Sequence, residues 1–118
     1  MLIFLYMERK DGIVYLLATS NEDGVYKIGV TRGSIERRIS KLQTGNSGDI
    51  YPIKTYVTRF PFFVESSLHR LYSSKNVLNE WYSLTDDEVS SFYDECRRFE
   101  DMAESLKDNP YFKYGNLR

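Results

Sequence analysis

The sequence predicts a small α+β domain, and three observations lead to that class. The chain has 118 residues, enough for one hydrophobic core, since a domain of this size buries roughly two-thirds of its unfolded surface. Segments rich in β-branched and aromatic residues are interspersed with segments whose apolar residues recur at helical spacing. The predicted order is strand, strand, helix, strand, helix, helix, with no repeat or linker, so residues 1–118 are expected to form a single domain.

Two segments predict a β-hairpin near the start of the chain. Residues 12–18 and 24–30 are both rich in strand-forming types, and the polar residues between them predict a loop of five or six residues. Residues 50–58 predict a third strand. Because proline lacks an N–H donor, Pro52 requires either that this strand lie at an edge of the sheet or that the proline stand among its first residues. The apolar residues 2–7 are either a further strand or a buried lead-in.

Two helices are predicted in the middle of the chain. Ser34 can cap a helix with the apolar stripe Ile35, Ile39 and Leu42, and residues 44–48 supply a stop signal. Pro61 suits the first turn of the second helix. Its predicted buried stripe consists of Val64, Leu68, Leu71 and Tyr72.

The C-terminal part predicts a short extended piece and a long helix. Residues 78–84 form the extended piece, and residues 85–88 have the form of a capping box. An apolar stripe then continues the helix over about residues 86–107, through Val89, Phe92, Tyr93, Cys96, Phe99, Ala103 and Leu106. The tail 109–118 is either packed through its aromatic residues or loose.

Composition and charge narrow the class of protein. Cys96 is the only cysteine and His69 the only histidine, which excludes an intrachain disulfide and a Cys/His zinc cage. Residues 2–7 are too few for a membrane span and lack the flanks of a signal peptide, so a cytoplasmic protein is expected. Residues 27–75 carry nine basic and three acidic side chains, whereas residues 80–108 carry three basic and ten acidic ones. The basic middle suits a polyanionic partner, although such an excess is also common on solvated surfaces.

Several residues have types that phosphodiester hydrolysis requires. That reaction needs a nucleophilic water, a positive field around phosphorus and neutralisation of the leaving oxygen. Tyr15, Lys27, Arg38, Glu65 and His69 could supply these together with a metal ion. Each also has a plainer interpretation: a tyrosine in a strand is commonly a packing residue, and Glu65 with His69, four apart on a helix, is commonly a surface pair. Lys27, in an otherwise apolar strand, is less expected, because a charged side chain there is costly to bury unless its ammonium group reaches solvent or an anion.

The order of five motifs resembles that of the GIY-YIG nuclease superfamily, especially a short phage and prokaryotic branch whose second motif reads Lys-Ile-Gly. The resemblance covers residues 12–84. The motifs are Gly12-Ile13-Val14-Tyr15, Tyr26-Lys27-Ile28-Gly29-Val30-Thr31, Glu36-Arg37-Arg38-Ile39-Ser40-Lys41-Leu42, Glu65-Ser66-Ser67-Leu68-His69 and Glu80-Trp81-Tyr82.

The resemblance implies a three-stranded antiparallel sheet flanked by helices, to which the C-terminal helix is an addition. It also implies a metal-dependent endonuclease that cuts nucleic acid, DNA above all, with one Mg²⁺ or Mn²⁺ ion in a prokaryotic or phage-infected cell. By position, Tyr15 matches the base or water-orienting group, Glu65 the metal ligand, and Arg38, rather than Arg37, the arginine that holds the scissile phosphate. Lys27 stands where many members have a second tyrosine, His69 matches a histidine common in this branch, and the late asparagine of many members has no clear counterpart.

Further expectations concern binding and orientation. Arg37, Lys41 and Arg70 are expected to contact nucleic acid, and a homodimer or a protein partner could supply specificity. Because side chains alternate along a strand, Tyr26, Ile28 and Val30 should face the larger core, whereas Lys27 and Gly29 share a face with Tyr15. Gly29 would then leave room for a phosphate. Trp81 and Tyr82 are expected to close the core, with a stacking platform for bases as the alternative.

Two other functions compete with the enzyme. The first is a nucleic-acid-binding module that keeps the fold without catalysis. The second is a protein-interaction or inhibitory module that uses the acidic residues 80–108.

Overall fold

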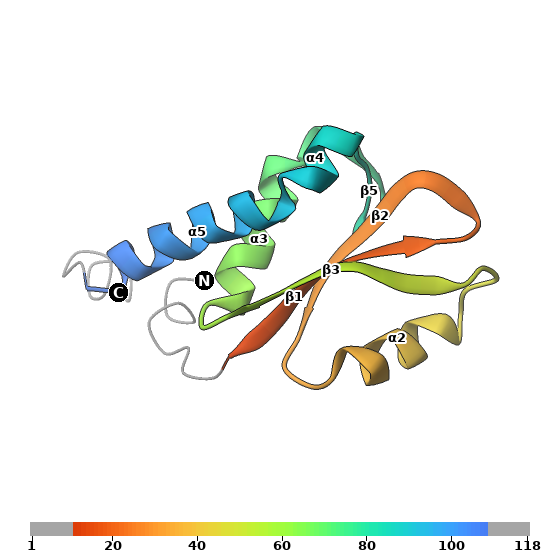
Figure 1. Cartoon of the computed structure of the whole chain (residues 1–118), viewed down its shortest axis with the longest axis horizontal. Coiled ribbons are helices and arrows are strands. Elements are labelled where there is room, and N and C mark those ends of the chain that lie inside the picture. Colours follow the sequence, from red (N-terminus) through yellow and green to blue (C-terminus); the bar gives the residue numbers. More distant parts are fainter. Residues whose placement is uncertain (1–10, 109–118) are drawn as a thin grey trace.

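The chain forms an antiparallel sheet with helices on both faces (Figure 1). The computed structural model describes residues 11–108, so the segments 2–7 and 109–118 lie outside the described residues. The strands are β1 (Gly12–Thr19), β2 (Glu22–Thr31), β3 (Ile50–Thr58), β4 (Asn76–Leu78) and β5 (Trp81–Ser83), in the order β3-β1-β2-β5-β4. The helices are α2 (Ile35–Gln43), α3 (Pro61–Leu71), the 3₁₀ turn η1 (Ser73–Lys75), α4 (Asp86–Ser90) and α5 (Phe92–Leu106). The α+β class is therefore confirmed.

Within residues 11–108 the sheet already has five strands, so the expectation of three strands was wrong. The two additional strands, β4 and β5, are three residues long and form a hairpin along β2. Its turn places Asn79 at a φ of 51°, a left-handed conformation that asparagine tolerates better than most residues. Strands of three residues are too short to show an alternating pattern, which is why only the extended character of residues 78–84 was visible.

The β1-β2 hairpin has a shorter loop than predicted. β1 continues to Thr19 and β2 begins at Glu22, so two residues connect the strands. The predicted loop residues Glu22 and Asp23 are exposed strand residues. Because both are polar, their sequence is typical of a loop.

The predicted edge position of Pro52 is confirmed within residues 11–108, because β3 ends the order of strands there. Leu16 is opposite Lys54 whereas Leu17 is opposite Pro52, which leaves Ile53 as the extra residue of a bulge. Proline is tolerated at such a position because no ladder hydrogen bond depends on it.

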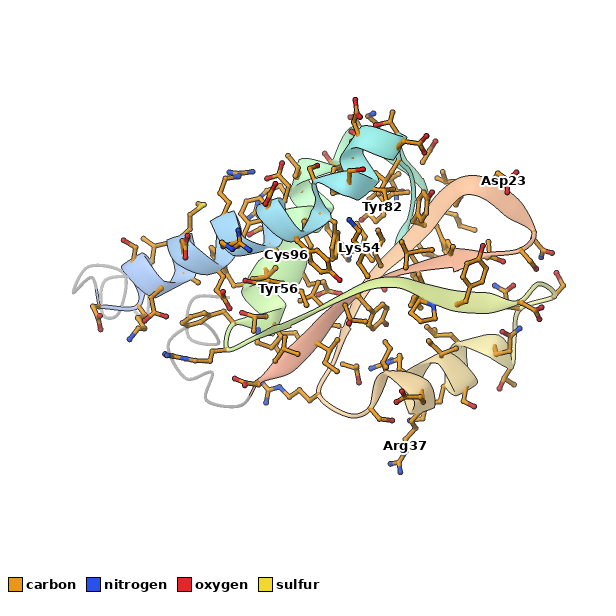
Figure 2. All side chains as sticks on the ribbon, viewed as in Figure 1. Asp23, Arg37, Lys54, Tyr56, Tyr82 and Cys96 are labelled. Atoms are coloured by element: carbon orange, nitrogen blue, oxygen red, sulfur yellow. The ribbon has the colours of Figure 1, made fainter. Side chains whose placement is uncertain are left out.

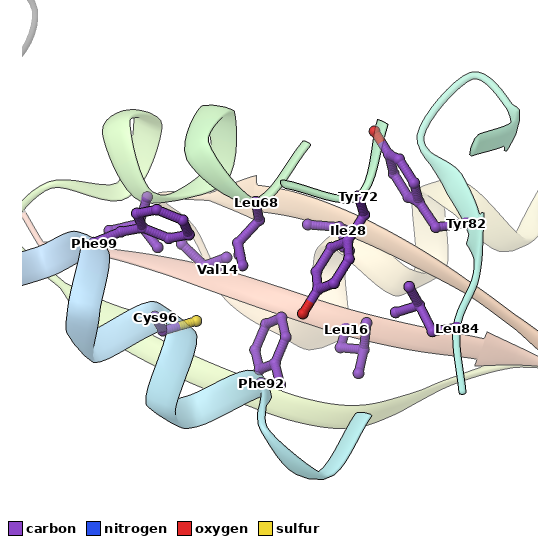
Figure 3. Packing of buried hydrophobic residues seen from close by; sticks show 11 residues of the cluster. Val14, Leu16, Ile28, Leu68, Tyr72, Tyr82, Leu84, Phe92, Cys96 and Phe99 are labelled. Atoms are coloured by element: carbon purple, nitrogen blue, oxygen red, sulfur yellow. The ribbon is translucent and has the colours of Figure 1, made fainter. Parts of the chain in front are cut away.

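Strand alternation creates two cores, one on each face of the sheet. Side chains of one set, including Val14, Leu16 and Ile28, meet α3 and α5 in the larger core (Figure 3). The other set, Tyr15, Leu17 and Ile50, packs against α2 through Ile35, Ile39 and Leu42. The predicted stripe of α2 is confirmed, as is its cap, because the Ser34 side chain accepts a hydrogen bond from the Arg37 N–H at 3.1 Å. The two faces of the sheet thus carry different helices.

α3 begins as predicted with Pro61 in its first turn, and its buried stripe includes Val64 and Leu68, with Tyr72 buried just beyond it. Leu71 was wrongly included in the stripe, since it is 41% exposed. It lies one residue before the buried Tyr72, and both positions fit a helical period equally well in sequence.

The helix predicted over residues 86–107 is two helices. The capping box of Thr85 and Glu88 is confirmed at the start of α4. Ser91 has a φ of −89° and a ψ of 5° and separates α4 from α5. Its hydroxyl donates a hydrogen bond to the Glu88 carbonyl at 3.2 Å, an interaction with the backbone that competes with regular helix. Tyr93, counted in the apolar stripe, is 39% exposed just after the break.

None of the helices within residues 11–108 is long and apolar enough to cross a membrane.

Candidate active site

Tyr15 and Lys27 lie on the same face of the sheet, as the alternation of side chains predicted. In the β1-β2 ladder, Tyr15 is opposite Gly29 and Leu17 is opposite Lys27. Residues that are paired directly across an antiparallel ladder share a face. Tyr26 and Val30 pack against the larger core on the other side. The α2 face of the sheet therefore carries the candidate residues of β1 and β2.

The ring of Tyr15 packs directly against Gly29 and occupies the space that a side chain at residue 29 would fill. A Cβ atom at Gly29 would lie 2.4 Å from the Tyr15 hydroxyl oxygen and 2.6 Å from its Cζ. The phenol therefore crosses directly over β2. The expectation that Gly29 would give a phosphate room was wrong, because Tyr15 fills that room.

α3 contacts β2 along the side of that strand that faces β5. β5 pairs with β2 only at Val25, Tyr26 and Lys27. At the next residue, Ile28, the N–H donates to the Glu80 carbonyl at 3.1 Å, and the carbonyl contacts the His69 Nε2 atom at 3.0 Å. A carbonyl only accepts, so Nε2 carries the hydrogen and donates it. His69 thus connects α3 to the edge of β2 at the point where β5 begins.

Glu65 reaches the same edge from one turn earlier in α3. Its Oε2 atom lies 3.8 Å from the His69 Nε2 atom, and its side chain is only 15% exposed. On the other side of His69, the Tyr82 ring packs with its centroid 5.5 Å from that of the imidazole. The Glu65–His69 pair is therefore an internal part of this edge and not a solvated surface pair.

Glu80 is a site residue to which sequence analysis gave no role. Its Oε1 atom lies 3.3 Å from the Lys27 Nζ atom. Glu65, His69 and Glu80 each offer one ligand atom, and these atoms lie within 4.8 Å of one another. The signal in the sequence was Lys27 itself, since a lysine in an apolar strand needs an ionic partner where its ammonium group does not reach solvent.

Trp81 and Tyr82 face opposite sides of the sheet. Tyr82 is buried in the larger core, as expected. For Trp81 that expectation was wrong: it pairs with Lys27 across the ladder, and the Lys27 Nζ atom lies 5.8 Å from its ring centroid. Consecutive strand residues cannot both face the core, and Trp81 consequently borders the site.

The acid–base properties of Tyr15 and Glu65 reflect their burial. Burial raises the pKa of Glu65 above its ordinary value, and His69, Lys27 and Arg38 oppose that rise while Glu80 adds to it. Burial also raises the pKa of Tyr15 to about 12, against the lowering effect of Arg38 and with smaller raising effects of Glu80 and Glu65. Residues from β1, β2, α2 and α3 therefore act on one another electrostatically at one site.

The two neighbouring arginines of α2 occupy different environments. Arg38 is partly buried and forms no side-chain hydrogen bond or ion pair within residues 11–108. Arg37 is exposed and projects away from the sheet (Figure 2), and Lys41 is exposed one turn later. Arg38 is thus the arginine whose charge acts on Tyr15 and Glu65.

Arg70 lies apart from the other candidate residues. It lines a groove between α3 and α5 with Phe63, Leu71 and Met102. Although Arg70 follows His69 in sequence, the helical turn directs it toward α5. The structure does not bring it together with Arg37, Arg38 and Lys41.

The donor set of the site fits a hard divalent cation. Glu65 and Glu80 offer carboxylate oxygens, the ligand type that Mg²⁺ and Mn²⁺ favour. His69 offers no Nε2 lone pair while it donates to Ile28. The two carboxylates, rather than the imidazole, are therefore the residues suited to hold such an ion.

Comparison with known proteins identifies a family. Neither the curated proteins nor the solved structures contain a match to this chain. The family model described as the T5orf172 domain matches residues 12–97, which is 86 of the 118 residues and includes every strand and helix that contributes to the site. T5orf172 domains are related to nuclease-type domains of the GIY-YIG and HNH-like kind. The chain therefore belongs to the T5orf172 domain family.

Proposed function

We propose that this protein is a GIY-YIG-type endonuclease that hydrolyses phosphodiester bonds of nucleic acid, DNA above all, with one Mg²⁺ or Mn²⁺ ion. The observation that supports this most is the convergence of a phenol, a lysine, an arginine and a buried carboxylate around β2. Tyr15, Lys27, Arg38 and Glu65 come from four different elements. The T5orf172 membership is consistent with a nuclease-like or nucleic-acid-related role.

Glu65 would hold the ion in this proposal. A divalent cation bound there would polarise the phosphate and lower the pKa of a water molecule. A carboxylate that burial keeps poorly solvated gains from such a cation, because the cation replaces the missing solvent.

The remaining residues act on the substrate with charges and hydrogen bonds. Tyr15, with a pKa of about 12, keeps its proton near neutral pH and would donate a hydrogen bond that orients the water or a phosphate oxygen. Lys27 and Arg38 would place positive charge around the phosphorus, where negative charge develops during attack. His69, which the hydrogen bond to the Ile28 carbonyl holds in place, lies 3.8 Å from Glu65 and would help to position that carboxylate.

The substrate would approach from the α2 side. Arg37 and Lys41 are exposed on the same helix as Arg38, and phosphate contacts by such side chains position a nucleic acid without reading its sequence. Arg70 lies outside this surface and would contact only a substrate that extends around α3. Sequence specificity would then come from a second copy of the chain or from another protein.

One incubation series tests the proposal. Plasmid DNA, single-stranded DNA and RNA are each incubated with the protein and with Mg²⁺, Mn²⁺ or a chelator, beside the Glu65→Gln variant. We expect metal-stimulated cleavage by the wild type and a loss of at least about a hundredfold in the variant, because the ion contributes several kcal/mol.

Burial of Tyr15 favours a second candidate function, a binding module without catalysis. Tyr15 is 2% exposed, and a catalytic phenol has to reach substrate or water. Equal DNA binding by wild type and Glu65→Gln, with no metal-stimulated cleavage of any substrate, would establish the binding module and reject the nuclease.

A further inference from the structure

We propose that Glu80 is a second carboxylate ligand of the divalent cation and that it exchanges between Lys27 and the ion. The inference rests on the proposed metal site at Glu65, and it concerns what controls that site. In the structure Glu80 pairs with Lys27. When a cation binds, Glu80 turns to it and releases the lysine ammonium for the phosphate of the substrate.

The positions of the atoms make this exchange possible without movement of the backbone. The Glu80 Oε1 atom lies 3.3 Å from Lys27 Nζ, while a ligand oxygen of Glu80 lies within 4.8 Å of one of Glu65. Two oxygens bound to one Mg²⁺ at about 2.1 Å each are about 3 to 4 Å apart. A side-chain rotation of Glu80 is enough to bring its oxygen from within 4.8 Å of the Glu65 oxygen to that shorter separation.

The exposure of the three side chains indicates which of them moves. Glu80 is 45% exposed, whereas Lys27 is 12% and Glu65 is 15% exposed. The backbone at Glu80 is held by the hydrogen bond from the Ile28 N–H to its carbonyl. Glu80 therefore combines a hydrogen-bonded backbone with a solvent-exposed carboxylate that has room to change partners.

Charge balance explains why the exchange links the metal to the substrate. Glu65 and Glu80 carry two negative charges, which Lys27 and Arg38 balance. A divalent cation adds two positive charges to the same site, and a phosphate then restores the balance by pairing with Lys27. Metal and nucleic acid should consequently each strengthen the binding of the other, by the same factor.

Metal titration without nucleic acid tests the ligand role. Binding of Mn²⁺ is measured by electron paramagnetic resonance for wild type, Glu80→Gln, Lys27→Met and the control Glu22→Gln, which removes an exposed carboxylate at the far end of β2. We expect Glu80→Gln to weaken Mn²⁺ binding by at least about tenfold, since ligand charge sets the affinity for hard cations. Lys27→Met should strengthen it because Glu80 loses its competing partner, and Glu22→Gln should leave it unchanged.

The two variants are expected to change Mn²⁺ affinity in opposite directions, so the test still decides if one of them is unstable. Equal Mn²⁺ affinity in wild type, Glu80→Gln and Lys27→Met would overturn the inference and leave Glu80 as a structural partner of Lys27. Circular dichroism verifies the fold of each variant, and should Glu80→Gln fail to fold, Lys27→Met alone decides between strengthened and unchanged binding.

DNA binding in the presence of Ca²⁺ tests the release of Lys27. Ca²⁺ also prefers oxygen ligands, and fluorescence anisotropy follows the affinity for a labelled DNA duplex. Ca²⁺ should strengthen DNA binding by wild type and have less effect on Glu80→Gln, whose lysine is free at all times. An equal effect of Ca²⁺ on both proteins would contradict the exchange.

The failure of this inference and that of the nuclease proposal give different results. A wild type that cleaves DNA but binds Mn²⁺ independently of Glu80 refutes the inference alone. A wild type that binds Mn²⁺ through Glu65 and Glu80 but cleaves no substrate refutes the nuclease alone.

Discussion

Glu65 carries a negative charge where the fold provides little water to solvate it. Its raised pKa means that the folded state holds the Glu65 proton more tightly than the unfolded chain does. The stability from this proton is present below the ordinary value of 4.5 and is lost as the pH rises through the folded value. Ionised Glu65 therefore destabilises the metal-free protein near neutral pH.

Replacement of Glu65 by Gln should accordingly stabilise the metal-free protein at pH 7 and lose that advantage at pH 4. Urea unfolding in chelator at both pH values measures the two free energies of unfolding. Addition of Mg²⁺ should then stabilise the wild type and leave Glu65→Gln unaffected, because only the wild type retains the carboxylate. A variant less stable than wild type at pH 7 would mean that hydrogen bonding, not desolvation, dominates at Glu65.

Arg38 and Arg37 are neighbours in sequence with different expected roles. Arg38→Ala should lower the cleavage rate about a hundredfold or more, since a lost charge at a developing oxyanion costs that much, with little change in melting temperature. Arg37→Ala, which removes an exposed side chain pointing away from the sheet, should weaken DNA binding only mildly. Single-turnover cleavage at saturating DNA compares the two, and the reverse ranking would place the phosphate on the outer side of α2.

At the level of elements, the pairing of β1 with β2 brings the Tyr15 ring directly over Gly29. Gly29→Ala would bring a Cβ atom to 2.4 Å from the Tyr15 hydroxyl oxygen, so the ring or the strand must shift. We expect a loss of about 1–3 kcal/mol in the free energy of unfolding, as for other overpacked cores. Gly45→Ala is the matched control, since nothing lies within 4 Å of its added Cβ, and urea unfolding compares the two. Equal stability of both variants would show that Tyr15 moves freely.

The elements that were predictable from sequence are those with a long run of one residue class or a complete repeating pattern. β1 and β2 contain runs of β-branched and aromatic residues, α2 has a full helical stripe, and the capping box located the start of α4. β4 has only three residues, and the break at Ser91 is confined to one residue whose hydroxyl bonds to the backbone. Neither leaves a periodic trace in sequence.

The same contrast applies to the candidate site. The face shared by Tyr15 and Lys27 was predictable, because alternation along β2 separates Lys27 from the more apolar set Tyr26, Ile28 and Val30, which was assigned to the larger core. Glu80 meets Lys27 across 53 positions of sequence, through the register of β2 with β5. That register depends on the β4-β5 hairpin, which was not predicted from sequence. The ion pair of Lys27 with Glu80 and the position of Trp81 were therefore not predictable either.

On the scale of the whole molecule, the two faces of the sheet differ in charge. α2, with Arg37, Arg38 and Lys41, covers one face, while α3 and the acid-rich α5 cover the other (Figure 1). Negative charge on α5 repels a nucleic acid and so favours its approach from the α2 side.

Reversal of exposed charges on α5 should weaken this preference. The double variant Asp94→Lys and Asp101→Lys is expected to bind DNA more tightly at low salt, with a steeper salt dependence, and to cleave no faster at saturating DNA. Lys41→Glu on α2 serves as the opposite control and should weaken binding. Binding isotherms over a series of salt concentrations measure both, and a faster single-turnover rate in the α5 variant would indicate productive binding at the wrong face.

The burial of Cys96 has a practical consequence for chemical labelling. It is the only cysteine in the sequence, it is fully buried in the larger core, and burial raises the pKa of its thiol to about 12. A thiol of this kind does not react with alkylating reagents while the protein is folded. Any cysteine introduced on the surface would therefore be the single reactive thiol of the native protein. A photocrosslinker attached at Ser40 of α2, or at Ser105 of α5 as the opposite point, would record which face the nucleic acid occupies without first removing the native cysteine.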